Sequence, residues 1–150
     1  MLPIIRKKGG FTLIELLVVI AILSVLLVIV LVAINPARQT REARNTQRRA
    51  DVLTVLNAVN QYFVANGSFP TGTPATTGSA ENIDSTLAGF CSDLVPTYVA
   101  ALPYDPSAAG ASYTDCGSYD TKYTITLNAG DRITIAAPNA EGGVTIQATR

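Results

Sequence analysis

Glu15 occupies the chemically most unusual position in this sequence. Its carboxylate directly precedes nineteen residues, Leu16–Ile34, of which Ser24 is the only polar member. A carboxylate beside such a segment is costly to bury, so it needs either a cationic partner or a place among solvated headgroups. In the first case Glu15 would form a charge pair in a dry environment. In the second case it would have no special role.

A pair of glycines, Gly9-Gly10, lies just before Glu15 and follows three basic residues. The basic residues are Arg6, Lys7 and Lys8. They are compatible with an ordinary secretory signal peptide, but the apolar segment is longer than the usual core of about 7–15 residues. No small-residue cleavage site directly follows it either. A cut after Gly10 would instead remove the basic residues and leave Phe11 at the start of an apolar helix.

Cys91 and Cys116 are the two cysteines of the chain. Outside the cytoplasm such a pair usually forms a disulfide, and closing a loop of this length stabilises a fold by about 3–4 kcal/mol. Two free buried thiols are the alternative. A metal site is disfavoured, because two cysteines without any histidine leave too few soft ligands.

The composition offers little for catalysis. Without histidine the chain cannot form a Ser-His-Asp or Cys-His arrangement, and nothing fixes two carboxylates at the separation that glycosidic chemistry needs. A membrane-tethered enzyme is therefore a remote alternative, and no cofactor is expected. After residue 50 there are nine acidic and three basic residues, which argues against a general nucleic-acid-binding domain.

Long helical segments must position these residues. The Leu16–Ile34 segment would rise about 28 Å as a helix, close to the hydrocarbon thickness of a bilayer, and it has no polar face. Apolar residues then recur at three- and four-residue spacing from Val52 to Phe63, and Asn66-Gly67 is a typical helix end. We expect one helix from Phe11 to about Ala65, kinked or locally broken at Pro36.

The C-terminal part predicts a small sheet. Apolar and polar residues alternate over 119–127, 131–136 and 143–148, with turn residues at 128–130 and 138–143. This pattern predicts a three-stranded antiparallel meander, covered by the apolar stripe of the preceding helix. The expected fold class is α+β. Residues 67–81 are rich in Gly, Pro, Ser and Thr and predict an exposed loop.

The segment KKGGFTLIELLVVIAIL, residues 7–23, resembles the prepilin signal of type IV pilins and of type II secretion pseudopilins. The resemblance implies that a membrane-embedded prepilin peptidase cuts after Gly10 and methylates the new terminus, Phe11. It also implies that Glu15 registers an incoming subunit against the N-terminal amine of its neighbour. The rest of the chain resembles the family only in layout.

Together the patterns and the resemblance divide the chain into four parts. They are a cleaved leader (1–10), a transmembrane and assembly helix (11–37), an amphipathic helix (38–66) and a head with a disulfide loop and a three-stranded sheet (67–150). Four arginines lie on one face of the expected helix, namely Arg38, Arg41, Arg44 and Arg48. They would meet anionic headgroups, acidic groups of neighbouring subunits or simply solvent. Nucleic-acid binding through them is disfavoured.

A smaller resemblance covers Leu94–Tyr113. Major pseudopilins have a similar stretch, with a proline-aspartate-proline turn before a calcium-binding loop. Asp105, Asp115 and Asp120 would be the oxygen ligands of such a site here. Their spacing matches no fixed calcium loop, so turn-forming aspartates are the favoured interpretation.

The expected function is a structural subunit of a type IV pilus-like extracellular filament. The expected partners are further copies of the chain, prepilin peptidase, the pilus assembly machinery, minor pilins and the cytoplasmic membrane. Before assembly the chain would cross that membrane once, with its N-terminus in the cytoplasm. The alternative is a pseudopilin of a type II secretion system, which the Leu94–Tyr113 resemblance favours. The cysteine-closed loop favours a pilin.

We predict that the mature chain begins at N-methylated Phe11, because Gly9-Gly10 separates the basic leader from the apolar helix. Intact-mass spectrometry of the assembled protein, followed by sequencing of the terminal peptide, measures this. A terminus after residue 34, or a leader retained in assembled material, would contradict the prediction.

Overall fold

The first helix, α1, spans Leu13–Ile34 in a computed structural model that describes residues 9–150. The basic residues of the expected leader, Arg6 to Lys8, lie outside the described residues. Helix α1 is apolar on every side, and its segment Leu13–Ala33 is long enough to cross a membrane, with none of it buried within the protein. The helix begins at Leu13 rather than at Phe11, because Thr12 has an extended backbone and caps it.

Asn35 separates α1 from the second helix, α2, which spans Pro36–Asn66. Its backbone is left-handed (φ 46°, ψ 78°), a conformation that asparagine tolerates better than most residues. Its side-chain oxygen also accepts a hydrogen bond from the Arg38 amide at 3.3 Å. Pro36 is then the first helical residue, where its missing N–H costs nothing. The expected break is confirmed, and it lies one residue before the proline.

The far end of α2 was predicted correctly. Gly67 follows Asn66 with a left-handed backbone (φ 72°), and its amide donates to the Phe63 carbonyl at 2.8 Å. Glycine adopts this conformation without steric cost and commonly terminates helices in this way.

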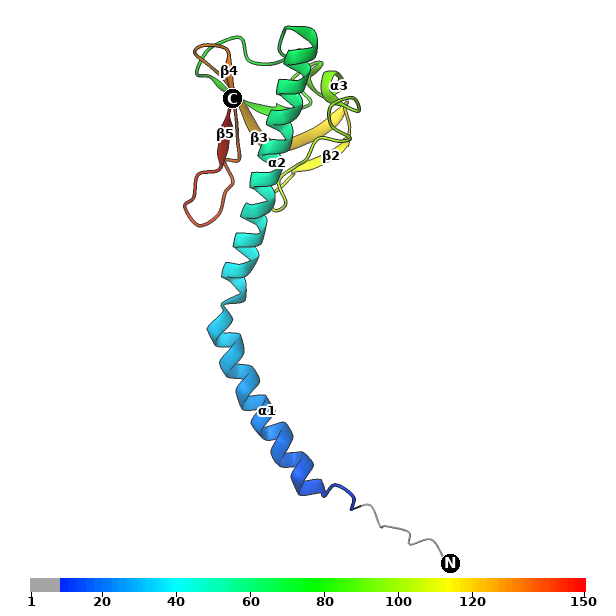
Figure 1. Ribbon diagram of the computed structural model, residues 1–150, viewed down its shortest axis with the longest axis vertical. Helices are drawn as coiled ribbons and strands as arrows, with labels where there is room; N and C mark the ends of the chain where they lie inside the picture. The colour runs from blue at the N-terminus through cyan, green and yellow to red at the C-terminus, as the bar shows by residue number, and fades with distance from the viewer. Residues whose placement is uncertain (1–8) are drawn as a thin grey trace, which may run out of the picture. The chain divides into compact units, whose positions relative to one another are not determined.

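The described chain separates into two compact units, one ending at Gln39 and the other comprising Thr40–Arg150, here called the head unit. The head unit contains five strands and one short helix besides most of α2 (Figure 1). The elements are β1 (Ala80–Asp84), α3 (Phe90–Leu94), β2 (Ser112–Asp115), β3 (Ser118–Asn128), β4 (Arg132–Ala136) and β5 (Gln147–Thr149). The sheet is antiparallel with the order β1-β3-β4-β5, and β2 also pairs with β3.

The predicted meander corresponds to β3, β4 and β5. Strand β5 is shorter than the predicted 143–148, because Gly142 and Gly143 both have positive φ and Val144 is exposed. Strands β1 and β2 and helix α3 were not predicted. Strand β1 begins at the end of the segment that was expected to be a loop.

Helix α2 covers the sheet with the apolar stripe that the sequence predicted. Its core-facing residues are Val52, Val55, Leu56, Ala58 and Val59, all nearly inaccessible to solvent. They pack with buried side chains of β1, β3 and β4, namely Ile83, Tyr123, Ile125, Ile133 and Ile135. Two members of the predicted stripe, Leu53 and Phe63, are partly exposed instead. The fold class is α+β, as predicted.

The disulfide between Cys91 and Cys116 is present, with the two Cα atoms 5.3 Å apart. It joins α3 to the segment directly after β2. Helix α3 has five residues and strand β2 has four, so the covalent link strengthens a region that is held by short elements.

Arg48 is completely buried, which corrects the expectation that all four arginines of its helix face are available to solvent, lipid or neighbours. Its guanidinium donates to both carboxylate oxygens of Asp105, at 2.8 and 2.9 Å. It also donates to Asn45, Ser107 and Glu141 at 2.8–3.3 Å. A two-pronged contact of this kind suits the planar guanidinium and compensates the cost of burying the charge.

The segment before β5 is fixed to α2 through the same group of residues. Glu141 accepts from Arg44 at 3.2 Å and from Arg48 at 3.3 Å. The Asn45 side chain donates to the Glu141 carbonyl and accepts from its amide, at 2.7 and 3.0 Å. Asn45 thus satisfies both backbone groups of Glu141. Polar contacts therefore hold to the rest of the head unit the two turns of α2 that lie N-terminal to Val52.

Removing the disulfide should destabilise the head unit. We predict that Cys116→Ala lowers the melting temperature of a soluble fragment beginning near Gln39 by about 10 °C or more, given the expected 3–4 kcal/mol. Thermal melting with and without reductant measures the effect on the unmodified fragment. Equal melting temperatures in the two conditions would contradict a stabilising bridge.

Asp105→Asn should be more damaging than an ordinary surface substitution, because it leaves the Arg48 charge buried without its carboxylate. We expect a loss of about 3–5 kcal/mol in the free energy of unfolding, measured by urea denaturation. Asp131→Asn is a matched control: Asp131 is exposed, so its change should stay within about 0.5 kcal/mol. Similar losses in both variants would contradict the assignment.

The same pair predicts an acid-sensitive head unit. Burial acts to raise the pKa of Asp105, but hydrogen bonds from Arg48, Ser107 and Ala108 outweigh it and hold that pKa below its ordinary value. A lowered pKa stabilises the folded state above the pKa of unfolded aspartate, about 3.9, and this contribution is lost as the pH falls through the folded value. The acid dependence of unfolding should therefore be weaker in Asp105→Asn than in the wild type.

Candidate processing and assembly site

The candidate site lies at the start of α1, where Thr12 and Glu15 form a reciprocal cap. The Thr12 amide and hydroxyl both donate to Oε2 of Glu15, at 2.9 and 2.7 Å, and the Glu15 amide donates to the Thr12 hydroxyl at 3.3 Å. This capping box satisfies two amides that a helix start otherwise leaves without partners. A carboxylate can accept about four hydrogen bonds, so Glu15 retains capacity for a further donor.

A shallow hollow of about 420 Å³ lies beside this cap. It is lined by Phe11, Ile14, Glu15, Val18 and Val19. The Glu15 carboxylate is therefore the single charged group of an otherwise apolar hollow. Such a surface suits a partner that combines apolar area with one cation.

Gly9 and Gly10 precede the helix in an irregular, exposed segment. A Cβ atom added to either residue would meet no heavy atom within 4 Å. The fold itself therefore does not require glycine at these two positions.

The three aspartates considered as calcium ligands have separate roles in the structure. Asp105 binds Arg48, Asp115 accepts the Gly117 amide at 2.8 Å, and Asp120 pairs with the Lys122 ammonium. Among residues 9–150 no group of three or more His, Cys, Asp or Glu side chains is arranged to hold a metal ion. Asp115 thus fits the favoured interpretation of a turn-forming aspartate, and Asp105 serves as a buried counter-ion.

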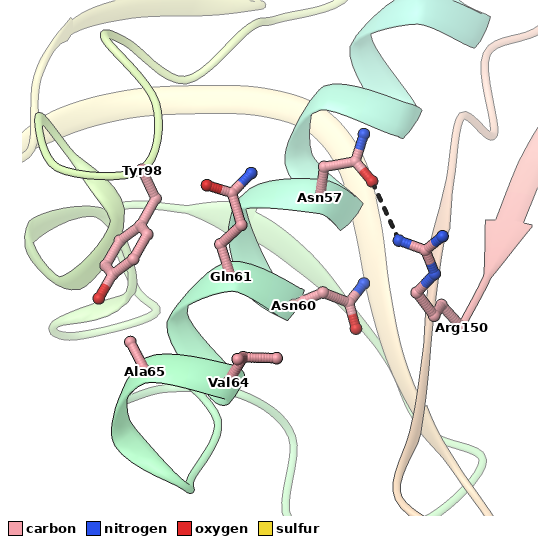
Figure 2. Close-up of a pocket in the computed structure, with 7 residues that line it drawn as sticks. All are labelled: Asn57, Asn60, Gln61, Val64, Ala65, Tyr98 and Arg150. Carbon is pink, nitrogen blue, oxygen red and sulfur yellow. Dashed lines mark hydrogen bonds between the residues drawn. The ribbon is translucent and has the colours of Figure 1, made fainter.

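A hollow of the head unit lies between the exposed side of α2 and the C-terminus (Figure 2). It has a volume of about 460 Å³ and is lined by Asn57, Asn60, Gln61, Val64, Ala65, Tyr98 and Arg150. Arg150 donates to the Asn57 side chain at 3.4 Å. These residues offer hydrogen bonds but no nucleophile with an adjacent base, so the hollow does not resemble a hydrolytic active site.

Sequence reasoning proposed roles for Gly10, Phe11 and Glu15, which stay predictions, and it missed one polar residue at this site and one in the head unit. Thr12 was overlooked, although Thr-x-x-Glu before an apolar segment is a recognisable capping signal. Asn45 was also overlooked, and no local pattern indicates it, because its partner Glu141 lies 96 residues away.

Comparison with known proteins gives one match. The family model of the prokaryotic N-terminal methylation motif matches residues 5–31. No curated protein and no solved structure shows a significant match to the chain. The matched residues include the two glycines, Phe11, Glu15 and most of α1. The chain therefore carries the N-terminal methylation motif of type IV pilins and pseudopilins, the prepilin signal.

Proposed function

We propose that this protein is a structural subunit of a type IV pilus-like filament. The observation that carries the proposal is the methylation motif on a helix with no buried face: Leu13–Ala33 is apolar except for Glu15 and Ser24, and none of it is buried within the described chain. Such a helix needs lipid or other copies of the same helix to cover it. In a subunit that is held in a membrane and then polymerises through this helix, lipid covers the helix before assembly and other copies of the helix cover it afterwards.

Processing is the first step of the proposed function. Prepilin peptidase cuts between Gly10 and Phe11 and methylates the Phe11 amine. The open surroundings of Gly10 support this, because the fold offers no steric reason for glycine there, whereas a peptidase that needs close access to the backbone does. The cut leaves a cationic amine four residues before Glu15.

Assembly is the second step. In the membrane the Glu15 carboxylate lies near the headgroups, but in the core of a filament it is surrounded by apolar helices. A neighbouring Phe11 amine then supplies the cation, and the two charges neutralise each other. The hollow that contains Glu15 supports this pairing, because its remaining lining is apolar and so matches the phenylalanine that carries the amine.

The disulfide-closed head unit supports a pilus subunit, which works outside the cell and must stay folded there. The proposed partners are other copies of the chain, prepilin peptidase, minor pilins and the assembly machinery. The chain is held in the cytoplasmic membrane before assembly and becomes part of a surface filament afterwards.

A pseudopilin of a type II secretion system is the second candidate, favoured by the Pro103–Pro106 stretch around Asp105. A deletion strain separates the two functions. Loss of surface filaments in electron microscopy, with secretion of exoproteins intact, supports the pilus subunit. Loss of secretion without loss of filaments supports the pseudopilin.

Glu15→Leu tests the assembly step. We expect normal cleavage and membrane insertion but a large reduction in filament number when this variant is the sole subunit. The substitution removes a charge and adds apolar surface, so poorer insertion would not explain a loss. Immunoblotting of membrane fractions and filament counts by electron microscopy measure the two properties.

Thr12→Ala is the matched control, since Glu15→Leu also removes the capping box. This control loses the cap, at a cost of about 1 kcal/mol to the helix, but keeps the carboxylate. Near-normal filament numbers in Thr12→Ala and few in Glu15→Leu assign the defect to the charge. Wild-type filament numbers in Glu15→Leu would refute the pairing with Phe11.

A further inference from the structure

The hollow of Figure 2 lies entirely within the head unit, and part of its lining is formed by three side-chain amides of α2. These amides belong to Asn57, Asn60 and Gln61. Their spacing of three and four residues places them on one face of the helix. Each amide carries both donors and acceptors of hydrogen bonds, so this face offers several of each within one hollow.

The amides retain capacity for hydrogen bonds with a ligand. Asn60 donates to the Leu56 carbonyl at 2.7 Å, which engages only its nitrogen. Asn57 accepts from Arg150 at 3.4 Å, a long contact that engages only its oxygen. The Gln61 side chain is exposed to solvent. Because an amide can donate two hydrogen bonds and accept two, donors and acceptors remain for a polar ligand.

Arg150 gives the hollow a positive charge. Of the lining residues, all of them in the described part of the chain, it alone carries a charged side chain, and no carboxylate side chain is among them. The backbone of Arg150 is fixed by two hydrogen bonds with Ile133, at 2.8 and 3.0 Å. The guanidinium therefore extends from a fixed point of the sheet beside the amides of α2 (Figure 2).

The remaining lining is apolar. Val64 and Ala65 lie one turn of α2 beyond the amides, and Tyr98 lies across from Arg150 in Figure 2. The Tyr98 ring makes an edge contact with Tyr62, at 5.6 Å between the ring centroids, and its hydroxyl accepts from Asn66 at 3.3 Å. These contacts hold the ring in place as a wall of the hollow.

We propose that this hollow binds an acidic saccharide. Arg150 contacts the carboxylate, since a guanidinium matches the geometry of that group. The amides of α2 contact hydroxyls, which also donate and accept hydrogen bonds. Val64 and Tyr98 contact the C–H groups of the sugar ring. The volume of about 460 Å³ lies within the range of small-molecule pockets, about 300–1,000 Å³, which favours a short saccharide over an extended peptide.

This inference does not rest on the filament function. Every residue of the hollow belongs to the head unit, whereas the proposed assembly acts through α1. A binding experiment on the unassembled chain therefore gives the same result whether or not the chain polymerises.

Isothermal titration calorimetry of the purified full-length chain in detergent tests the inference. The probes are sialyllactose and digalacturonate, two saccharides with different acidic sugars. Lactose is the matched control, because it is sialyllactose without the acidic sugar. We expect saturable binding of at least one acidic probe, and binding of lactose that is weaker by about tenfold or more, because lactose offers no carboxylate to Arg150.

Two substitutions locate the binding in the hollow. Arg150→Gln should weaken binding of the acidic saccharide by about tenfold or more, whereas Arg132→Gln, the same change at an exposed residue of β4, should not. Gln61→Ala should weaken binding by about threefold or more, whereas Gln47→Ala, at an exposed residue of the same helix, should not. Thermal melting followed by circular dichroism establishes that each variant is folded.

Four outcomes would overturn the inference. They are no saturable binding of either acidic probe up to about 10 mM, equal binding of lactose and sialyllactose, equal losses in Arg150→Gln and Arg132→Gln, and binding by Gln61→Ala as tight as by Gln47→Ala. An acidic tripeptide that binds as tightly as the saccharides would also exclude the assignment to sugars.

Discussion

The burial of one guanidinium, that of Arg48, is the constraint on which the head unit depends. An isolated charge in this position would be strongly unfavourable, so every group around it must supply an acceptor. Asp105 supplies two, and Asn45, Ser107 and Glu141 supply the others. These acceptors come from α2, from the segment after Pro103 and from the segment before β5. Supplying hydrogen-bond acceptors to this one guanidinium therefore brings three distant parts of the sequence together.

The two units of the chain differ in how their apolar surface is kept from water. Within residues 9–150 no part of the membrane-length segment of α1 is buried, so its apolar surface depends on surroundings outside this part of the chain. The head unit buries its own apolar surface between α2 and the sheet, and a disulfide links α3 to the segment after β2. Glu15 and Thr12 lie at the start of α1 in the first unit, and Arg48 lies within the second. In each case the charged group is kept in place by hydrogen bonds from its own chain.

Local periodicity decided what the sequence could predict. The apolar run of α1, the stripe on α2 and the alternation in β3 and β4 each repeat over several residues, so their structures follow from neighbours in sequence. Strand β1, AENID, has Ile83 as its single buried residue, and its pairing with β3 is visible only in three dimensions. Arg48 was expected at the surface because its partner is 57 residues away. Roles for Gly10, Phe11 and Glu15 could be proposed because the prepilin motif is contiguous, whereas Asn45 belongs to no motif.

Asn35 has a consequence for how such a chain can change over time. The residue ends α1 and contributes the first side-chain hydrogen bond of α2, so each helix has its own terminus. The matched motif stops at residue 31, just before this point. A helix whose end is defined locally is modular: mutations and exchanges beyond Asn35 can reshape the head unit without altering the matched motif or the apolar helix that carries it.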